Sequence, residues 1–204
     1  SNRGLSGAFN ANVRKEARKL VSEKYPDQFN KGNVTFLTIG KKGYDYLRKQ
    51  ELKLLPEQNS LLNNLTFDNV TVVAEAVMAE FVAGEYDKVE LIYNQFKNAA
   101  VQNLTCEQFL PVETVAKGSN NSVPTDYIYE PTREDIVQEL IPKSLKIQFY
   151  KAVLDSFVAE HGARMTAMHK ATDNATNMIR ELTLQYNKAR QAAITNQILE
   201  VVSG

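Results

Sequence analysis

The sequence predicts an α/β fold, a mostly parallel sheet flanked by helices, followed by one very long carboxyl-terminal helix of a coiled coil. Three observations predict it. Strand-like runs alternate with amphipathic stretches up to about residue 130, residues 143–202 contain no proline and one glycine, and apolar residues in that second part recur at alternating spacings of three and four. We therefore expect an α/β domain over residues 1–130 and a coiled-coil helix over residues 131–204.

The first part alternates between two kinds of segment. Short runs rich in β-branched and aromatic residues predict strands at 34–39, 89–93 and 104–112, and amphipathic stretches predict helices at 9–24 and 67–83. Alternation of this kind is typical of a Rossmann-like layer in which helices cover a parallel sheet. The turn-rich segment 117–125 predicts an exposed loop.

The second part predicts a single helix from Pro142 to Val202, because the residues after Pro142 are rich in Ala, Leu, Gln, Lys and Met and include one glycine, Gly162. At about 1.5 Å per residue this helix would extend about 90 Å, against about 40 Å for a compact domain of the remaining size. We therefore expect it to reach well beyond its own domain.

Apolar residues form a stripe along this helix. Its clearest members, called the coiled-coil seam below, are Met168, Ala171, Ala175, Met178 and Leu182. The same spacing extends backward through Ile147, Tyr150, Leu154 and Phe157 and forward to Ala189 and Ala192. A second helix should lie along the seam, and no other segment of the 204 residues is long enough to supply it. We expect the partner on another chain or on a part of the protein outside these residues.

Composition narrows the class of protein. The 24 Lys and Arg residues are balanced by 24 Asp and Glu residues, which removes the usual electrostatic case for a nucleic-acid binder. The most apolar window, Val70 to Val82, is interrupted by two glutamates and is too short to span a bilayer. No basic-then-apolar stretch follows Ser1, so we expect no secretory signal. Cys106 stands alone, so we expect an intracellular protein in which this thiol is buried and inert.

Motifs for catalysis or cofactor binding are missing. Neither a phosphate-binding loop nor a full dinucleotide fingerprint occurs, and His161 and His169 lie two helical turns apart, too far for one metal ion. We therefore expect no catalytic residue, no metal and no cofactor. Two alternatives stay open on the residues alone: an α/β nucleotide- or small-molecule-binding enzyme with a dimerising helix, which requires a ligand-filled crevice, and a static coiled-coil tether.

The far end of the long helix is basic and polar. Lys188 and Arg190 lie among amide side chains, with no acidic residue between Glu181 and Glu200. A solvated helix end with favourable cations would look the same. The other interpretation is an interaction tip whose Arg and amide side chains donate hydrogen bonds to acidic groups of a surrounding protein.

Three blocks resemble one family in its own order. Residues 163–175 (ARMTAMHKATDNA) with residues 182–195 (LTLQYNKARQAAIT) closely resemble the carboxyl-terminal helix of the gamma subunit of F-type ATP synthases. Residues 1–10 (SNRGLSGAFN) resemble the family's S-D-R-G-L-C-G-G-F-N turn, with Asn2 and Ser6 as departures, and residues 127–131 (YIYEP) resemble its Y-x-Y-E-P. The resemblance covers essentially the whole chain.

The resemblance implies a non-catalytic central rotor that transmits torque during proton-driven ATP synthesis or ATP hydrolysis. Its expected partners are the alpha and beta subunits, the small epsilon-type subunit and the c-subunit ring, and its expected place is peripheral, on the cytoplasmic face of a bacterial inner membrane or the matrix or stromal face in an organelle. The resemblance also makes the coiled coil antiparallel. The partner of the seam would be the family's amino-terminal helix, which with the first strand lies upstream of Ser1.

Several residues carry over by position. Arg190 and Gln191 match the pair that contacts the beta subunit's catch loop, and Thr195 lies one turn further along the helix. Arg164, with Met165, matches the coupling region near the bottom of the hexamer. Tyr129 and Glu130 match positions near the membrane ring.

Overall fold

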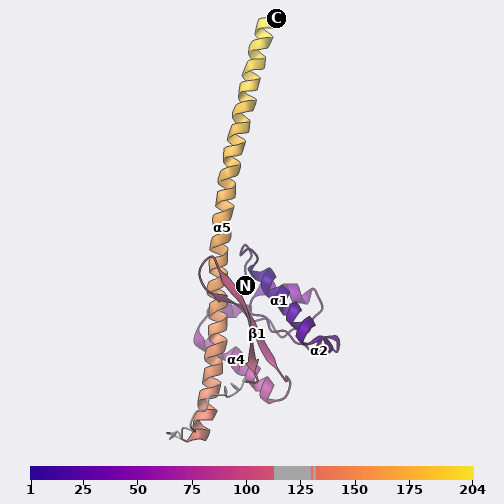
Figure 1. Cartoon of the computed structure of the whole chain (residues 1–204), viewed down its shortest axis with the longest axis vertical. Helices are drawn as coiled ribbons and strands as arrows, with labels where there is room; N and C mark the ends of the chain where they lie inside the picture. The colour runs from indigo at the N-terminus through magenta and orange to yellow at the C-terminus, as the bar shows by residue number, and fades with distance from the viewer. Residues whose placement is uncertain (113–129, 131) are drawn as a thin grey trace, which may run out of the picture. The chain divides into compact units, whose positions relative to one another are not determined.

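A computed structural model describes residues 1–112, 130 and 132–204, with side chains omitted for 133–136. Its elements are α1 (Phe9–Lys24), α2 (Pro26–Asn30), α3 (Lys41–Arg48), the 3-10 helix η1 (Asn59–Leu62), α4 (Phe67–Val82), β1 (Val89–Phe96), β2 (Gln102–Leu110) and α5 (Arg133–Ser203) (Figure 1). The chain divides into two compact units, residues 1–164 and 165–204.

Two predicted helices form as expected. Helix α1 has the predicted bounds, and α4 begins after Thr66, whose hydroxyl accepts a hydrogen bond from the Asn69 amide and so caps the helix. Its buried residues, Val70, Val73, Ala74 and Val77, follow the three-four spacing of a single helical face.

The predicted strands pair differently from the expectation. In the described residues β1 and β2 form an antiparallel pair, with Tyr93 opposite Thr105. Only five residues, 97–101, join them, and a parallel crossover needs about a dozen or more. The predicted strand 34–39 is reduced to one parallel bridge between Phe36 and Leu54. The coarse α/β composition with a long terminal helix is confirmed, and the mostly parallel sheet is not.

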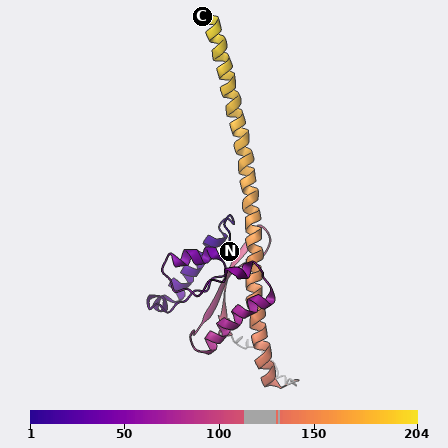
Figure 2. The same cartoon turned by 180° about the vertical axis from the view of Figure 1, so that it is seen from behind.

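The core of the first unit lies where α4, β2 and the first part of α5 meet. Phe109 of β2 is 1% exposed and its ring lies 5.6 Å from that of Phe149 in α5. From α5 the core also receives Leu145 and Val153. Figures 1 and 2 show the hairpin between α1 on one side and this part of α5 on the other. The first 32 residues of α5 (133–164) thus belong to the globular unit.

Helix α5 begins nine residues before the predicted start at Pro142. Pro142 lies inside the helix and cannot donate a hydrogen bond to the carbonyl of Gln138, and the helix continues through it. In the globular unit α5 buries Leu145, Phe149 and Val153, whereas Ile147 of the predicted stripe is 50% exposed. The core therefore uses a face of α5 adjacent to the predicted stripe.

Candidate functional site

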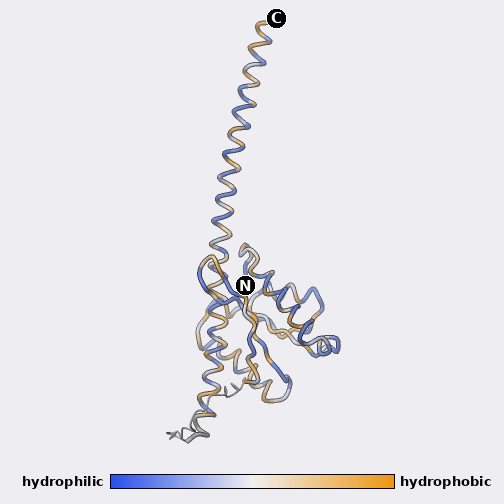
Figure 3. Tube along the Cα trace, in the orientation of Figure 1, coloured by the Kyte–Doolittle hydropathy of each residue, from blue (hydrophilic) through white to orange (hydrophobic). Residues whose placement is uncertain are grey.

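The second unit, residues 165–204, is helix from Met165 to Ser203. At about 1.5 Å per residue it extends about 60 Å. None of its residues is buried, and all but Thr166, Ala167 and Asn187 are exposed. Figure 3 shows apolar and polar residues interspersed along it. A helix this long with no buried side chain has no core of its own, so its stability must come from a partner.

The coiled-coil seam lies open along this unit. Met168, Met178 and Leu182 are 55%, 62% and 56% exposed, and Ala171 and Ala175 between them are also exposed. The threonines near the seam bond to their own helix: Thr172 Oγ1 donates to the Met168 carbonyl at 3.1 Å, and Thr183 Oγ1 to that of Ile179 at 2.7 Å. These hydroxyls therefore make few demands on a neighbouring helix. The seam can take an apolar partner without leaving a buried donor unpaired.

The predicted contact residues near the far end of α5 have exposed side chains. Arg190, Gln191 and Thr195 are all exposed, and among the described residues none forms a hydrogen bond or ion pair with their side chains. Gln191 and Thr195 are four residues apart, so they lie on one face of the helix, and Arg190 lies about 100° around the axis from Gln191. The five donors of the guanidinium are directed to solvent, which leaves them open to an acidic or carbonyl-bearing partner.

Arg164 lies in a different setting, at the end of the globular unit. It forms an ion pair with Glu160 one turn earlier, and its Nε donates to the carbonyl of Gly4 at 3.4 Å. The side chains of Glu160 and Arg164 are 9% and 18% exposed. The structure thus brings Arg164 together with the Ser1–Gly7 loop, whereas the tip residues lie in the second unit. Met165 is exposed at the start of that unit.

The expected membrane-ring contacts fall at the edge of what the structure describes. Glu130 is exposed, and Tyr129 lies outside the described residues. The predicted loop 117–125 also lies outside them. Of the described helices, none is both long and apolar enough to cross a membrane.

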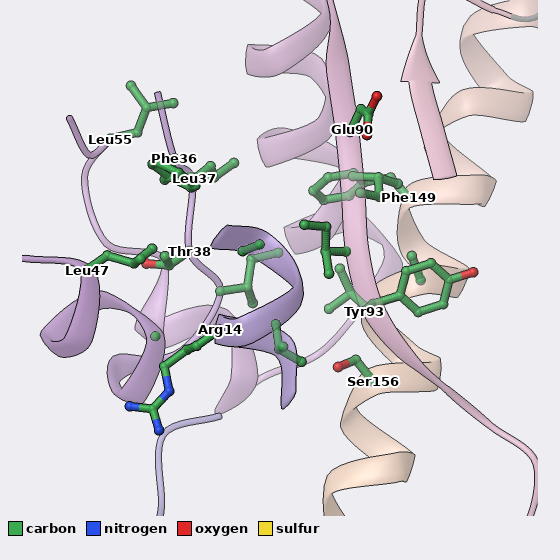
Figure 4. Close-up of a pocket in the computed structure, with 18 of the residues that line it drawn as sticks. Arg14, Phe36, Leu37, Thr38, Leu47, Leu55, Glu90, Tyr93, Phe149 and Ser156 are labelled. Carbon is green, nitrogen blue, oxygen red and sulfur yellow. The ribbon is translucent and has the colours of Figure 1, made fainter. Parts of the chain in front are cut away.

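A groove of about 340 Å³ runs through the first unit. Figure 4 shows Phe36, Leu37 and Thr38 on one side of it and Tyr93 and Phe149 on the other. The consecutive residues Thr35–Ile39 and Val89–Tyr93 both line it. A strand turns alternate side chains to opposite faces, so consecutive lining residues indicate that each segment presents its backbone edge to the groove.

The groove offers little chemistry. Its lining is mostly apolar, and burial raises the pKa of Tyr93 to about 12, so that phenol stays neutral at physiological pH. Across residues 1–112, 130 and 132–204 no group of three or more His, Cys, Asp or Glu side chains is arranged to hold a metal ion.

An electrostatic cluster at the edge of the hairpin was missed by sequence reasoning. Glu90 of β1, with a side chain 7% exposed, pairs with Lys24 at 2.5 Å and Lys88 at 3.6 Å and accepts a hydrogen bond from the Tyr25 hydroxyl. Burial pushes the pKa of Glu90 upward, but the hydrogen bonds from Lys24 and Tyr25 outweigh it and hold that pKa below its ordinary value. The cluster fastens the end of α1 to β1.

Cys106 belongs to the same cluster and corrects an expectation. It lies in the middle of β2 and is exposed, not buried. Its Sγ donates a hydrogen bond to Glu90 at 3.4 Å. Partial burial is the main cause that raises the pKa of this thiol to about 11, and the hydrogen bond to the Glu90 carboxylate is the second. The thiol is therefore protonated at neutral pH and a weak nucleophile despite its exposure.

Replacing Glu90 tests the cluster. We expect Glu90→Gln to lower the free energy of unfolding by about 2 kcal/mol at pH 7, because charged acceptors of buried hydrogen bonds contribute about 1.5–3 kcal/mol. The folded pKa of Glu90 lies below the unfolded value of about 4.5, so its contribution is complete above that pH and is lost as the pH falls through the folded pKa. Urea unfolding should show the gap between wild type and variant closing between pH 7 and pH 3; a gap that widened would contradict this.

Comparison with known proteins gives a consistent result. The family model described as ATP synthase matches residues 1–204. The ATP synthase gamma chain of Flavobacterium psychrophilum is 56% identical over all of this chain and 69% of its own length, and that of Cytophaga hutchinsonii is 50% identical over all of this chain and 70% of its own.

Two solved structures share the fold. The chain aligns in full, over 68% of the other chain, with a TM-score of 0.65 and 22% identity, to a chain of the Euglena gracilis mitochondrial ATP synthase comprising OSCP, F1 and c-ring. It aligns over 84% of its length, and 73% of the other chain, with a TM-score of 0.60 and 24% identity, to a chain of the central stalk and c-ring of the Tetrahymena thermophila mitochondrial ATP synthase.

Proposed function

This chain belongs to the ATP synthase gamma family, and we propose that it is the central rotor shaft of an F-type ATP synthase. It transmits torque between the membrane c-subunit ring and the catalytic beta subunits and performs no chemistry itself. The observation that carries this function is the helix of residues 165–203, which has an open seam and no buried residue. Such a helix needs surrounding protein, as a shaft within a sleeve of alpha and beta subunits has.

The division of labour follows the two parts of the sequence. Residues 1–130 form the foot, with Tyr129 and Glu130 near the c-subunit ring. Residues 131–204 form the shaft, whose first part, up to residue 164, is packed in the globular unit and whose residues 165–204 enter the alpha/beta hexamer. The complex lies on the cytoplasmic face of a bacterial inner membrane, because the relatives at 50% identity and above are bacterial gamma chains. The seam packs against the subunit's own amino-terminal helix, antiparallel.

The mostly parallel, Rossmann-like sheet is completed by a strand from outside these 204 residues. Two observations support it: Thr35–Ile39 and Val89–Tyr93 turn their backbone edges to the same groove, and Phe36 already bridges Leu54 in the parallel sense. A strand between the two edges could pair with backbone donors and acceptors of both. The apolar groove would then be part of the core.

The shaft works by stiffness and asymmetry. An off-centre helical pair presents a different side to each surrounding beta subunit, and differential contacts bias each subunit toward an open or closed state. Arg190, Gln191 and Thr195 are the contacts with the beta subunit's catch loop. These contacts are directional hydrogen bonds and there are few of them, so they can form and break as the shaft turns. Arg164 and Met165 belong to the coupling region lower on the shaft.

Truncating the tip tests this assignment. In the complex assembled with full-length subunit, Arg190→Ala combined with Gln191→Ala should lower the rate of ATP synthesis about tenfold or more, because a lost charge-assisted hydrogen bond is worth about 1.5–3 kcal/mol. Arg190→Lys should recover only part of the rate, since a lysine lacks the guanidinium fork.

The neighbouring Lys188→Ala is the control and should stay within about twofold of wild type. A tip double variant as active as that control would remove Arg190 and Gln191 from the contact. Purified subunit alone should hydrolyse no ATP; hydrolysis by the pure chain would contradict the proposed function itself.

A further inference from the structure

Helix α5 carries its one glycine at the point where another backbone touches it. Gly162 is buried, and a Cβ built on it would lie 3.1 Å from the carbonyl oxygen and 3.2 Å from the Cα of Ala99. Glycine is a poor residue for a helix interior, so its presence here calls for a local reason. The reason is the turn between β1 and β2, whose main chain rests on the helix where a side chain would stand. Figures 1 and 2 both place this turn beside α5.

The turn that rests on Gly162 is held rigidly. Asn98 Oδ1 accepts hydrogen bonds from the amides of Ala100 at 3.0 Å and Val101 at 2.7 Å. Gln102 Nε2 donates to the Ala99 carbonyl at 3.0 Å, the same oxygen that faces Gly162. With its backbone fixed from both flanks, the turn cannot yield easily when the helix presses against it.

A second loop holds the opposite side of α5 at the same height. Arg164, ion-paired with Glu160, donates to the Gly4 carbonyl at 3.4 Å. At about 100° per residue, position 162 points about 160–200° away from positions 160 and 164. The Gly4 loop is itself fastened to the domain, since Asn2 Nδ2 donates to the Asn59 carbonyl at 2.9 Å and Asn2 Oδ1 accepts from the Lys41 amide at 3.0 Å. The two loops therefore contact opposite faces of one turn of α5.

We propose that this collar, made of Gly4 and Ala99 around Glu160, Gly162 and Arg164 of α5, is the grip that stops the shaft helix from twisting in its domain under load. The inference rests on the proposed rotor function. Rolling α5 would expose Leu145, Phe149 and Val153, and the backbone seated on a glycine and the ion-paired side chain bonded to a carbonyl add directional contacts that further resist rotation about the helix axis. The collar passes torque between the foot and the shaft.

The test uses the complete complex in sealed vesicles, with full-length subunit carrying Gly162→Val, Asn98→Ala or both. Gly162→Val displaces the turn, and Asn98→Ala loosens it while leaving the helix unchanged. We expect each to lower proton-driven ATP synthesis at least fivefold while ATP hydrolysis stays above half of the wild-type rate. The double variant should synthesise ATP no more slowly than the slower of the two single variants, because both substitutions remove the same contact. Gly162→Ala, with a smaller clash, should fall between wild type and Gly162→Val.

Lys151→Val, at an exposed position of the same helix, is the matched control and should behave as wild type. Equal losses in the rates of ATP synthesis and ATP hydrolysis would contradict the proposed role of the collar. So would a double variant whose loss of synthesis is the sum of the two single losses. So would unchanged synthesis in Asn98→Ala, which stays informative if Gly162→Val does not fold. A wild-type complex that makes no ATP would refute the proposed function, whereas an active wild type matched by every variant would refute only the collar.

Discussion

Phe109→Ala should destabilise the globular unit by about 3–5 kcal/mol, the usual range for removing a buried phenylalanine ring. Phe109 is among the most buried large side chains of the described residues, and it joins β2 to α4 and α5 within one apolar cluster. Its neighbour Phe149 would face the resulting cavity across the 5.6 Å ring contact. The loss is a large fraction of the about 5–15 kcal/mol that holds a typical domain together.

Urea unfolding followed by circular dichroism measures this change. The matched control is Phe96→Ala in β1, a phenylalanine that is 37% exposed and should cost about 1 kcal/mol or less. Equal losses in the two variants would mean that Phe109 does not lie at the centre of the core.

Two acidic residues in the coiled-coil seam should abolish assembly. Met178 and Leu182 are more than half exposed in this chain, and burying each against a partner helix is worth about 1.5–3 kcal/mol. Met178→Asp with Leu182→Asp removes that gain and places two like charges in an apolar contact, where each costs several kcal/mol unless it is paired. The combined effect exceeds about 6 kcal/mol, or more than about ten-thousandfold in the equilibrium constant for pairing the seam with its partner helix.

Native mass spectrometry of the complex assembled with full-length subunit reads out the result. The control carries the same two charges off the seam, as Asn177→Asp with Asn187→Asp, and should assemble normally. If the seam variant assembled as well as this control, residues 168–182 would not be the face that a partner helix covers.

How far the sequence predicted the fold depended on whether each element was specified locally. Helix α4 could be predicted because the cap at Thr66 and the spacing of Val70, Val73 and Val77 are local. The run 34–39 could not, because an extended segment becomes a strand only through a partner, and among the described residues Phe36 alone forms a bridge, to Leu54. The antiparallel pairing of β1 and β2 was missed, although the ten residues between the predicted strands 89–93 and 104–112 are already fewer than the dozen or more that a parallel crossover needs.

The features of the candidate site also divide into those specified locally in the sequence and those that depend on the tertiary structure. The seam could be read from its three-four spacing, and its exposure in the structure agrees with a helix that lacks its partner. The ion pair of Glu160 and Arg164 was also readable, from the spacing of four. The contacts of Gly4 with Arg164 and of Ala99 with Gly162 join residues far apart in the chain, and only the tertiary structure brings them together.

Single-molecule observation of the assembled complex tests the central claim most directly. With the alpha and beta subunits fixed to a surface and a bead attached through Lys97→Cys, in the turn of the hairpin, in a Cys106→Ser background, ATP should drive the bead in one direction, in steps of about a third of a turn as three beta subunits act in sequence. A bead that stayed still while the complex hydrolysed ATP at its normal rate would show that this chain is a static part of the assembly and not its shaft.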